Sequence, residues 1–230
     1  MGDFSWEHIY SEGKHNNRWP WSDLVSLFFR YQEILNPTTS PAPQTRLRVL
    51  ELGSGTGNNI AFWKSVGADY FAIEQSPTAV RKALEKFPDL QDNIAVGDFS
   101  DFAFSDKEFD IVCDRAAVTH GSTREISETI GAANKALRKG GLFFGVDWFS
   151  MNHSDYLLPT AVIDQHTKSD FASGQFVGVG KVHFSDREHL LQLFKDFLIL
   201  ELDEKVITRH YPEIDEHHFA SWNVVARKPQ

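Results

Sequence analysis

A glycine-rich stretch follows the first strand-like run of the chain, within the segment RLRVLELGSGTGNN (46–59). Gly53, Gly55 and Gly57 have no Cβ atoms, so the backbone can turn sharply there and a ligand can approach the main chain closely. An acid, Glu51, stands at the end of the run just before them. In open α/β sheets, ligands bind at the carboxyl ends of the strands, beside such a turn. The segment therefore predicts a small-molecule site.

Three known kinds of glycine loop can be compared with this one. A phosphate-binding Walker loop continues with Gly-Lys-Ser/Thr, whereas Gly57 is followed by Asn58 and Asn59, so that kind is excluded. A dinucleotide loop needs Gly or Ala where Asn58 stands, so its fit is poor. The third pattern, acid-x-G-x-G-x-G, is satisfied, with Glu51 as the acid.

Two further acids follow the next strand-like runs. Glu74 ends YFAIE (70–74), close to the ~20-residue spacing at which an acid meets ribose hydroxyls in nucleotide sites. Asp98 follows NIAVG (93–97). Glu74 is alternatively a solvated acid at a strand end, and Asp98 alternatively caps the turn that begins at Ser100. Glu51 and Glu74, the two acids that flank the glycine loop, favour the binding of a cofactor.

Titratable side chains also lie at the carboxyl ends of the runs FDIVC (109–113) and GLFFGVDW (141–148), or a few residues after them. The candidates for a catalytic base are Asp114, His120, Asp147 and His153. A histidine that titrates near neutrality suits a general base. His120 is equally well interpreted as a histidine at the start of a helix that satisfies a backbone carbonyl. The histidines form no H-E-x-x-H spacing, so no metal site is predicted.

Short β-branched runs alternate with amphipathic stretches over most of the chain. This alternation predicts βαβ units and a mostly parallel sheet covered on both faces. Ser76 and Pro77 predict a helix start. Ser122 and Glu125 predict a capping box for a helix that Gly140-Gly141 ends.

The C-terminal third has a different pattern. Ser185 and Glu188 predict a second capping box, for a helix within 184–194. The runs 197–211 and 217–228 predict an antiparallel pair at a sheet edge. Residues 149–183 show no clean period and are expected to form a substrate loop or lid.

The composition limits the possible binding partners and the possible cellular location of the protein. The chain has 230 residues and a formal net charge of −9, which disfavours a nucleic acid as partner. No apolar run is long enough to span a membrane, and the N-terminus lacks the pattern of a signal peptide. Cys113, the single cysteine, lies in an apolar run and is expected to be buried and inert. We expect a soluble, cytoplasmic protein.

Taken in order, these motifs resemble those of class I S-adenosylmethionine-dependent methyltransferases. VLELGSGTG is similar to the family's first motif, and VGDFSD, FDIVCDRAAVTHG, ALRKGGLFFGVDW and WNVVARKP are similar to later ones. The resemblance covers about residues 47–228. It implies an α/β, Rossmann-like fold with a mostly parallel seven-stranded sheet, an antiparallel last strand, and an N-terminal helical arm. The domains would be an arm and linker over 1–45 and a methyltransferase domain over 46–230.

The resemblance implies S-adenosylmethionine as cofactor. In the family, the glycine loop wraps the methionine part, and the acid that matches Glu51 orders this loop and the aminoacyl group. The acid that matches Glu74 accepts from both ribose hydroxyls. Asp98 and Phe99 match adenine neighbours, although Phe99 is equally well a core residue. The whole expected cofactor set is Glu51, Gly53, Ser54, Gly55, Gly57, Glu74, Gln75, Asp98, Phe99, Arg115 and Arg18.

The N-terminal arm is rich in aromatic residues and is similar to arms of bacterial methyltransferases of polysaccharide and related secondary pathways. Arg18 is expected to pair with the cofactor's carboxylate or an anionic substrate, and the tryptophans to cover the sheet. These features favour methylation of a small molecule or saccharide at oxygen. The alternatives are an NAD(P)-dependent oxidoreductase and a non-catalytic binding module. Nucleic-acid methylation is disfavoured by the negative net charge. It is also disfavoured because the fourth run is followed by DRAA (114–117) and not by a motif of the type N/D-P-P-Y/F. The acceptor, the base and the oligomeric state stay open.

Overall fold

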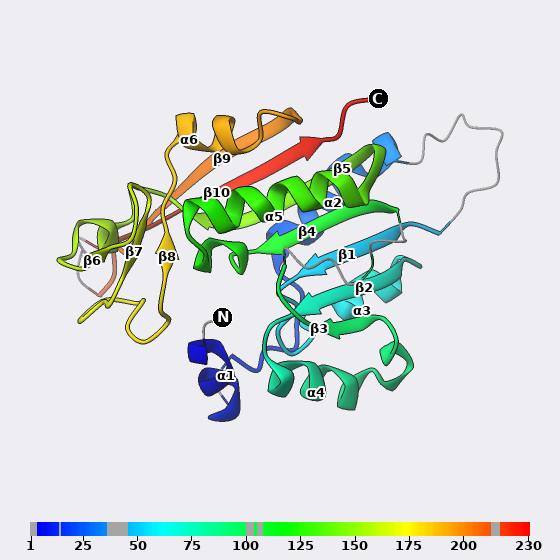
Figure 1. The fold of residues 1–230 in the computed structure, drawn as a ribbon, viewed down its shortest axis with the longest axis horizontal. Coiled ribbons are helices and arrows are strands. Elements are labelled where there is room, and N and C mark those ends of the chain that lie inside the picture. The colour runs from blue at the N-terminus through cyan, green and yellow to red at the C-terminus, as the bar shows by residue number, and fades with distance from the viewer. Residues whose placement is uncertain (1–3, 14, 36–45, 100–103, 105–107, 213–216) are drawn as a thin grey trace.

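The computed structural model describes residues 4–13, 15–35, 46–99, 104, 108–212 and 217–230 (Figure 1). Residues 36–45 of the expected arm and linker, and Ser100, where a turn capped by Asp98 would begin, lie outside the described residues. None of the described helices is long and apolar enough to cross a membrane.

A seven-stranded sheet forms the centre of the molecule. In spatial order its strands are β3 (Ile94–Val96), β2 (Asp69–Glu74), β1 (Arg48–Leu52), β4 (Phe109–Arg115), β5 (Leu137–Phe149), β10 (His218–Arg227) and β9 (Leu198–Thr208). The first five pair in parallel, and β10 runs antiparallel to both of its neighbours. The predicted mostly parallel sheet and the antiparallel pair at its edge are confirmed.

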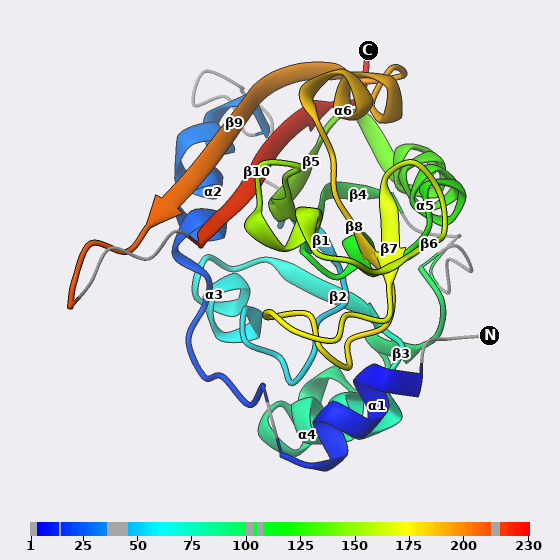
Figure 2. The same cartoon turned by 90° about the vertical axis from the view of Figure 1, so that its left-hand side faces the viewer.

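Helices cover both faces of this sheet. Among the described residues, one face is covered by α2 (Ser22–Leu35), α3 (Ile60–Ser65) and α4 (Pro77–Lys86). The other face is covered by α5 (Thr123–Ala136) and α6 (Arg187–Leu193) (Figures 1 and 2). Neighbouring strand residues point to opposite faces, so Val49 packs in the first core and Leu50 in the second. Both side chains are fully buried, as are those of parallel strands in general. Cys113 is also buried, as expected.

Two helix starts were predicted correctly. The Ser76 hydroxyl accepts a hydrogen bond from the Ala79 N–H at the start of α4. At the start of α5, Ser122 and Glu125 form the reciprocal capping box.

Two other helix boundaries differ from the prediction. Helix α5 ends at Ala136, because the chain enters β5 at Leu137, which pairs with Phe109 of β4. Helix α6 is capped by Asp186, whose side chain accepts from the His189 N–H. Ser185 does not cap it, because its backbone hydrogen-bonds to Phe149 and Met151 beside the end of β5.

Residues 149–183 contain more regular structure than a loop. They form a 3-10 turn, Ser154–Leu157, and a small antiparallel sheet of β6 (Ala161–Val162), β7 (Thr167–Ser169) and β8 (Val182–His183). Strands this short cannot show a period of two in the sequence. Figure 1 shows this small sheet and α1 (Phe4–Ser11) on the side toward which the parallel strands point.

Three histidines lie together where the small sheet meets α6. The His183 ring hydrogen-bonds to the Thr167 hydroxyl at 2.9 Å, and its Nε2 lies 3.0 Å from the Nε2 of His189. His166 stacks on His189, with 3.6 Å between ring centroids. Burial lowers the pKa of His183 to about 3 and that of His189 to about 4.

We expect the free energy of unfolding to fall in acid because of this cluster. The native His183 ring stays neutral at pH values where the unfolded chain binds a proton, that is, between about 6.5 and 3. Its stabilising effect is therefore complete above pH 6.5 and is lost as the pH falls. Between pH 7 and pH 5, the wild type should lose on the order of 1–2 kcal/mol more than His183→Gln. Urea titrations at both pH values measure this difference, and equal losses would contradict it.

Candidate active site

A cavity of about 410 Å³ opens at the carboxyl ends of β1, β2, β4 and β5. Its volume lies within the range of roughly 300–1,000 Å³ that small-molecule sites occupy. Its lining includes ten of the residues singled out in the sequence: Glu51, Gly53, Ser54, Gly55, Glu74, Gln75, Asp98, Phe99, Arg115 and His120. Five others do not line it: Gly57, Arg18, Asp114, Asp147 and His153.

The glycine loop lies tightly against two other segments. Gly53 and Gly55 have φ angles of +69° and +54°, in the left-handed region that favours glycine. A Cβ atom on Gly53 would lie 2.1 Å from the Ala117 Cβ, and one on Gly55 would lie 2.6 Å from the Tyr10 hydroxyl. Only glycine fits at these two positions. The closeness of Tyr10 to Gly55 places α1 directly on the loop.

Two buried acids, Glu51 and Glu74, fix this loop through hydrogen bonds. Glu51 accepts hydrogen bonds from the Asn59 side-chain amide and the Tyr70 hydroxyl, each at 2.7 Å. Glu74 accepts from the backbone N–H groups of Gly55 and Ser76, each at 2.8 Å. Burial raises the pKa of Glu51 to about 7 and raises that of Glu74 as well. The acids thus fix both the loop and the start of α3.

The ends of β2 and β3 contribute the next part of the lining. The Gln75 amide donates to the Asp98 carboxylate at 3.4 Å. Phe99 is half-buried and packs at the edge of the α5-side core, and its ring would lie 3.4 Å from a Cβ on Gly53. Phe99 therefore both packs against the core and lines the cavity.

The lining suits a cationic ligand with several polar groups. Glu51, Glu74 and Asp98 give this end of the cavity an acidic character. The Ser54 hydroxyl is buried and has no hydrogen-bond partner among the described residues. A polar ligand would supply that partner. These features fit S-adenosylmethionine, which carries a sulfonium, an amino acid and a nucleoside.

His120 lies in the wall of the cavity, at the end of the 3-10 turn Val118–His120. Its Nδ1 lies 2.9 Å from the Lys181 carbonyl oxygen. Because a carbonyl only accepts, Nδ1 carries a proton and the neutral ring has its basic lone pair on Nε2. The carbonyl contact that seemed to compete with a catalytic role is thus the contact that sets the tautomer.

Lys181 is held in place by its own side chain. Its ammonium lies 2.7 and 2.9 Å from the two carboxylate oxygens of Glu125. Burial alone would raise the pKa of Glu125, but hydrogen bonds from Lys181 and Ser122 lower it to about 2. The small-sheet segment is thereby fastened to α5 next to His120.

The two candidate aspartates are engaged elsewhere. Asp114 accepts from the N–H groups of Ala117 and Val118 and from the Trp148 indole, and burial raises its pKa to about 7. Asp147 has a φ of +55° and forms ion pairs with Arg115, at 3.0 Å, and with Lys205. Asp147, a candidate base, does not line the cavity, and its side chain is held by these two partners.

Two cofactor candidates also lie away from the cavity. A Cβ on Gly57 would lie 2.6 Å from Ile60 Cδ1, so this glycine allows close packing of α3. Arg18 is exposed and does not line the cavity. Arg115 does line it, and its guanidinium stacks 3.7 Å above the ring of Trp21.

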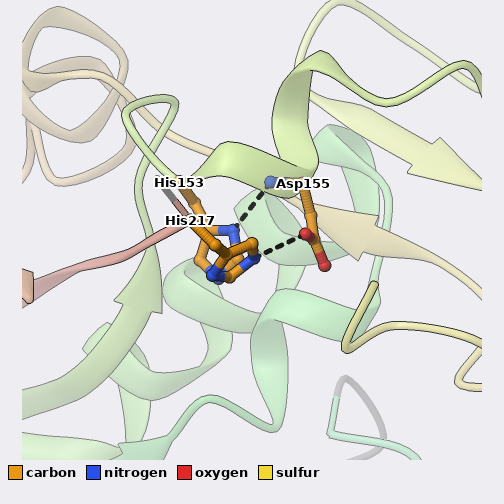
Figure 3. A group of neighbouring side chains, drawn as sticks. All are labelled: His153, Asp155 and His217. Atoms are coloured by element: carbon orange, nitrogen blue, oxygen red, sulfur yellow. Dashed lines mark hydrogen bonds and ion pairs between the residues drawn. The ribbon is translucent and has the colours of Figure 1, made fainter. Parts of the chain in front are cut away.

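His153 belongs to a group with Asp155 and His217, in which His153 and Asp155 are buried and His217 is half-buried (Figure 3). Its Nδ1 accepts from the Asp155 N–H at 3.0 Å, and the Asp155 carboxylate pairs with His217 Nε2 at 2.8 Å. Burial lowers the pKa of His153 to about 4, which makes it a weak base. The ligand atoms of the group lie within 4.8 Å of one another, so it has the composition of a metal site. However, the accepting Nδ1 places the ring proton on Nε2, which does not suit metal binding.

Several residues of the lining were missed as site residues by the sequence reasoning. They are Trp6, Tyr10, Asn17, Gln175, Phe176, Lys181 and Phe219. The aromatic residues of the arm signalled that it covers something. Phe176 and Phe219 gave no signal, because ordinary core phenylalanines have the same local pattern.

Helix α1 is tied to the start of α4. Glu7 accepts from the Thr78 hydroxyl at 2.6 Å, from the Thr78 N–H at 3.2 Å and from the Ser76 hydroxyl. The Lys82 ammonium donates to the Tyr10 carbonyl at 2.6 Å. These contacts hold Tyr10 above the glycine loop.

We expect Glu7→Gln to loosen α1 and to weaken binding of S-adenosylhomocysteine threefold to tenfold. The amide cannot accept as strongly from Thr78, so the closed position of Tyr10 is less populated. Calorimetric titration measures the affinity, and limited proteolysis reports the release of α1. Glu12→Gln, which changes an exposed acid just beyond α1, is the control. If both variants bind like the wild type, α1 does not contribute to the site.

The comparisons with known proteins agree with this geometry. Residues 50–145 match the family described as "Methyltransferase domain". An uncharacterized methyltransferase of Anoxybacillus flavithermus is 28% identical over 152 residues, which are 66% of this chain and 68% of that protein.

Two solved structures have a similar fold. One is an S-adenosylmethionine-dependent methyltransferase from Methanosarcina mazei, with a TM-score of 0.62, 18% identity, and coverage of 81% of this chain and 94% of that one. The other is magnesium protoporphyrin IX methyltransferase from Synechocystis PCC 6803, solved with bound S-adenosylmethionine. Its TM-score is 0.56 with 14% identity, and the match covers 90% of this chain and 77% of that one.

Residues 50–145 thus form a methyltransferase domain, and the fold is the Rossmann-like fold of class I methyltransferases. The matches support the assignment of the chain as an S-adenosylmethionine-dependent methyltransferase. The oxidoreductase and the non-catalytic module are not favoured by these matches.

Proposed function

We propose that the chain methylates a hydroxyl group of a small molecule or saccharide, and that His120 is the base that removes the hydroxyl proton. The observation that carries this proposal is the hydrogen bond from His120 Nδ1 to the Lys181 carbonyl, in the wall of the cavity. It leaves the basic lone pair on Nε2. A base fixed in this way acts without first having to reorient.

The glycine loop and the acids around it are proposed to hold the cofactor. Gly53, Ser54 and Gly55 would contact its amino acid part, with Glu51 fixing the loop. Glu74 would accept from the ribose hydroxyls, because each oxygen of a carboxylate can accept more than one hydrogen bond and so has capacity beyond the backbone N–H groups that it already binds. Gln75, Asp98 and Phe99 would contact the adenine.

The cofactor supplies the methyl group on a positively charged sulfur. The chain's part is to align the acceptor, to exclude water and to take up one proton. The contact of Tyr10 with the glycine loop supports a role for α1 in excluding water. The Lys181–Glu125 ion pair supports a role in fixing His120.

The proposal is tested by incubating the purified protein with methyl-labelled S-adenosylmethionine and a set of small alcohols, phenols, sugars, amines and thiols. We expect methyl ethers among the labelled products. Labelled products that carry the methyl group only on nitrogen, carbon or sulfur would contradict methylation at oxygen.

A further inference from the structure

One side of the cavity is apolar and largely aromatic. Its side chains, which we call the aromatic wall, are Trp6, Phe149, Phe176, Val179 and Phe219. Phe149 and Phe176 are buried, with 4.6 Å between their ring centroids, whereas Trp6 and Phe219 are half-buried. Phe149 ends β5 and Phe219 lies at the start of the adjacent β10, whereas Trp6 comes from α1, and Phe176 and Val179 come from the segment between β7 and β8. The glycine loop follows β1, and Glu74 ends β2. The wall therefore lies on the acceptor's side.

The proposed base is part of this aromatic surrounding. The His120 ring has Trp6 at 4.8 Å and Phe149 at 5.9 Å between centroids, both edge to face. An acceptor whose hydroxyl reaches His120 Nε2 must lie close to these rings. Aromatic rings in such contact attract each other beyond the effect of buried area alone.

The charged groups beside the wall are already paired. Arg115 forms an ion pair with Asp147, and Lys181 forms one with Glu125. The acceptor's side thus offers no uncompensated charge among these four groups. A saccharide would bring several hydroxyls to a largely apolar surface, where each unpaired polar group costs free energy.

The acidity of the acceptor hydroxyl also favours a phenol over a saccharide. A phenol loses its proton near pH ~10, as tyrosine does, whereas an aliphatic hydroxyl is closer to water, near ~16. A histidine base of ordinary pKa ~6.5 is better matched to the phenol by several pH units. The step is therefore easier for a phenol.

We infer that the acceptor is a small, uncharged phenol that binds against the aromatic wall, and not a saccharide. This inference rests on the proposed function. The phenol proton passes to His120 Nε2, and the phenol oxygen forms a bond to the methyl carbon. The bond from that carbon to sulfur breaks, and its electron pair stays on sulfur.

The test measures binding separately from turnover. The protein is first titrated with S-adenosylhomocysteine, and the saturated complex is then titrated with p-cresol, 4-methylcyclohexanol and methyl glucoside. The first two have the same carbon and oxygen skeleton and differ in whether the ring is aromatic. We expect p-cresol to bind at least tenfold more tightly than the other two and to be converted to 4-methylanisole when S-adenosylmethionine is present.

Variants of Trp6 test the wall itself. Trp6→Leu should weaken p-cresol binding about tenfold, whereas Trp6→Phe, which keeps a ring, should stay within threefold of the wild type. Phe29→Leu, on the exposed side of α2, controls for general loss of an aromatic side chain. Thermal unfolding verifies that each variant is folded.

The possible results separate the two proposals. Absence of S-adenosylhomocysteine binding would overturn the proposed function and the inference with it. Cofactor binding with equal or tighter binding of methyl glucoside or 4-methylcyclohexanol would overturn the phenol inference alone. Unchanged p-cresol affinity in a folded Trp6→Leu would do the same.

Discussion

Replacing Glu74 with alanine is expected to weaken S-adenosylhomocysteine binding at least 100-fold, or about 2.7 kcal/mol. The buried carboxylate accepts from the N–H groups of Gly55 and Ser76, so its loss leaves two buried donors unpaired and releases the glycine loop. It also removes the proposed acceptor for the ribose hydroxyls. Isothermal titration calorimetry measures the change.

Two further variants sharpen this test. Glu74→Gln keeps the shape but presents an amide group to the N–H donors, so its loss should be similar. Glu85→Ala changes an exposed acid of α4 that pairs with Arg81 at 2.7 Å, and it should bind like the wild type. If a folded Glu74→Ala binds within threefold of the wild type, Glu74 does not hold the cofactor.

Replacing His120 with alanine is expected to lower kcat by about 10²–10⁴-fold, the usual contribution of a general base. S-adenosylhomocysteine affinity should stay within threefold, because the proposed cofactor contacts involve other residues. The fall in wild-type kcat toward acid pH should also disappear. Steady-state kinetics from pH 5.5 to 9 measure both effects.

His8→Ala is the matched control, because His8 lies on α1 with its side chain 73% exposed. It should leave kcat and its pH profile unchanged. A folded His120→Ala variant that retains a fifth or more of the wild-type kcat would assign the proton to another group or to water.

Much of the fold followed from local patterns. The β-branched runs and the caps at Ser76 and Ser122 act over a few residues, so one sequence suffices to find them. The end of α5 could not be predicted from a local pattern. Gly140-Gly141 is a good helix terminator, but pairing of Leu137 with β4 ends the helix earlier. Such a tertiary contact has no local sequence signal.

The same distinction applies to the site. The glycine loop and the acids after β1 and β2 are local features, and they line one cavity. The role of Asp147 was not predictable, because its partner Lys205 comes 58 residues later in another strand. The tautomer of His120 depends on a carbonyl 61 residues away. The first contact forms only when β9 and β10 join the large sheet beside β5, and the second only when the segment before β8 packs against the turn that holds His120.

The central claim is that the glycine-loop end of the cavity holds the cofactor and points its sulfur toward His120. A crystal structure of the chain with S-adenosylhomocysteine tests it most directly. We expect the ribose hydroxyls within hydrogen-bond distance of Glu74, the adenine beside Asp98 and Phe99, and the sulfur facing the aromatic wall. S-adenosylhomocysteine bound elsewhere, or turned so that its sulfur faces away from His120, would contradict the account.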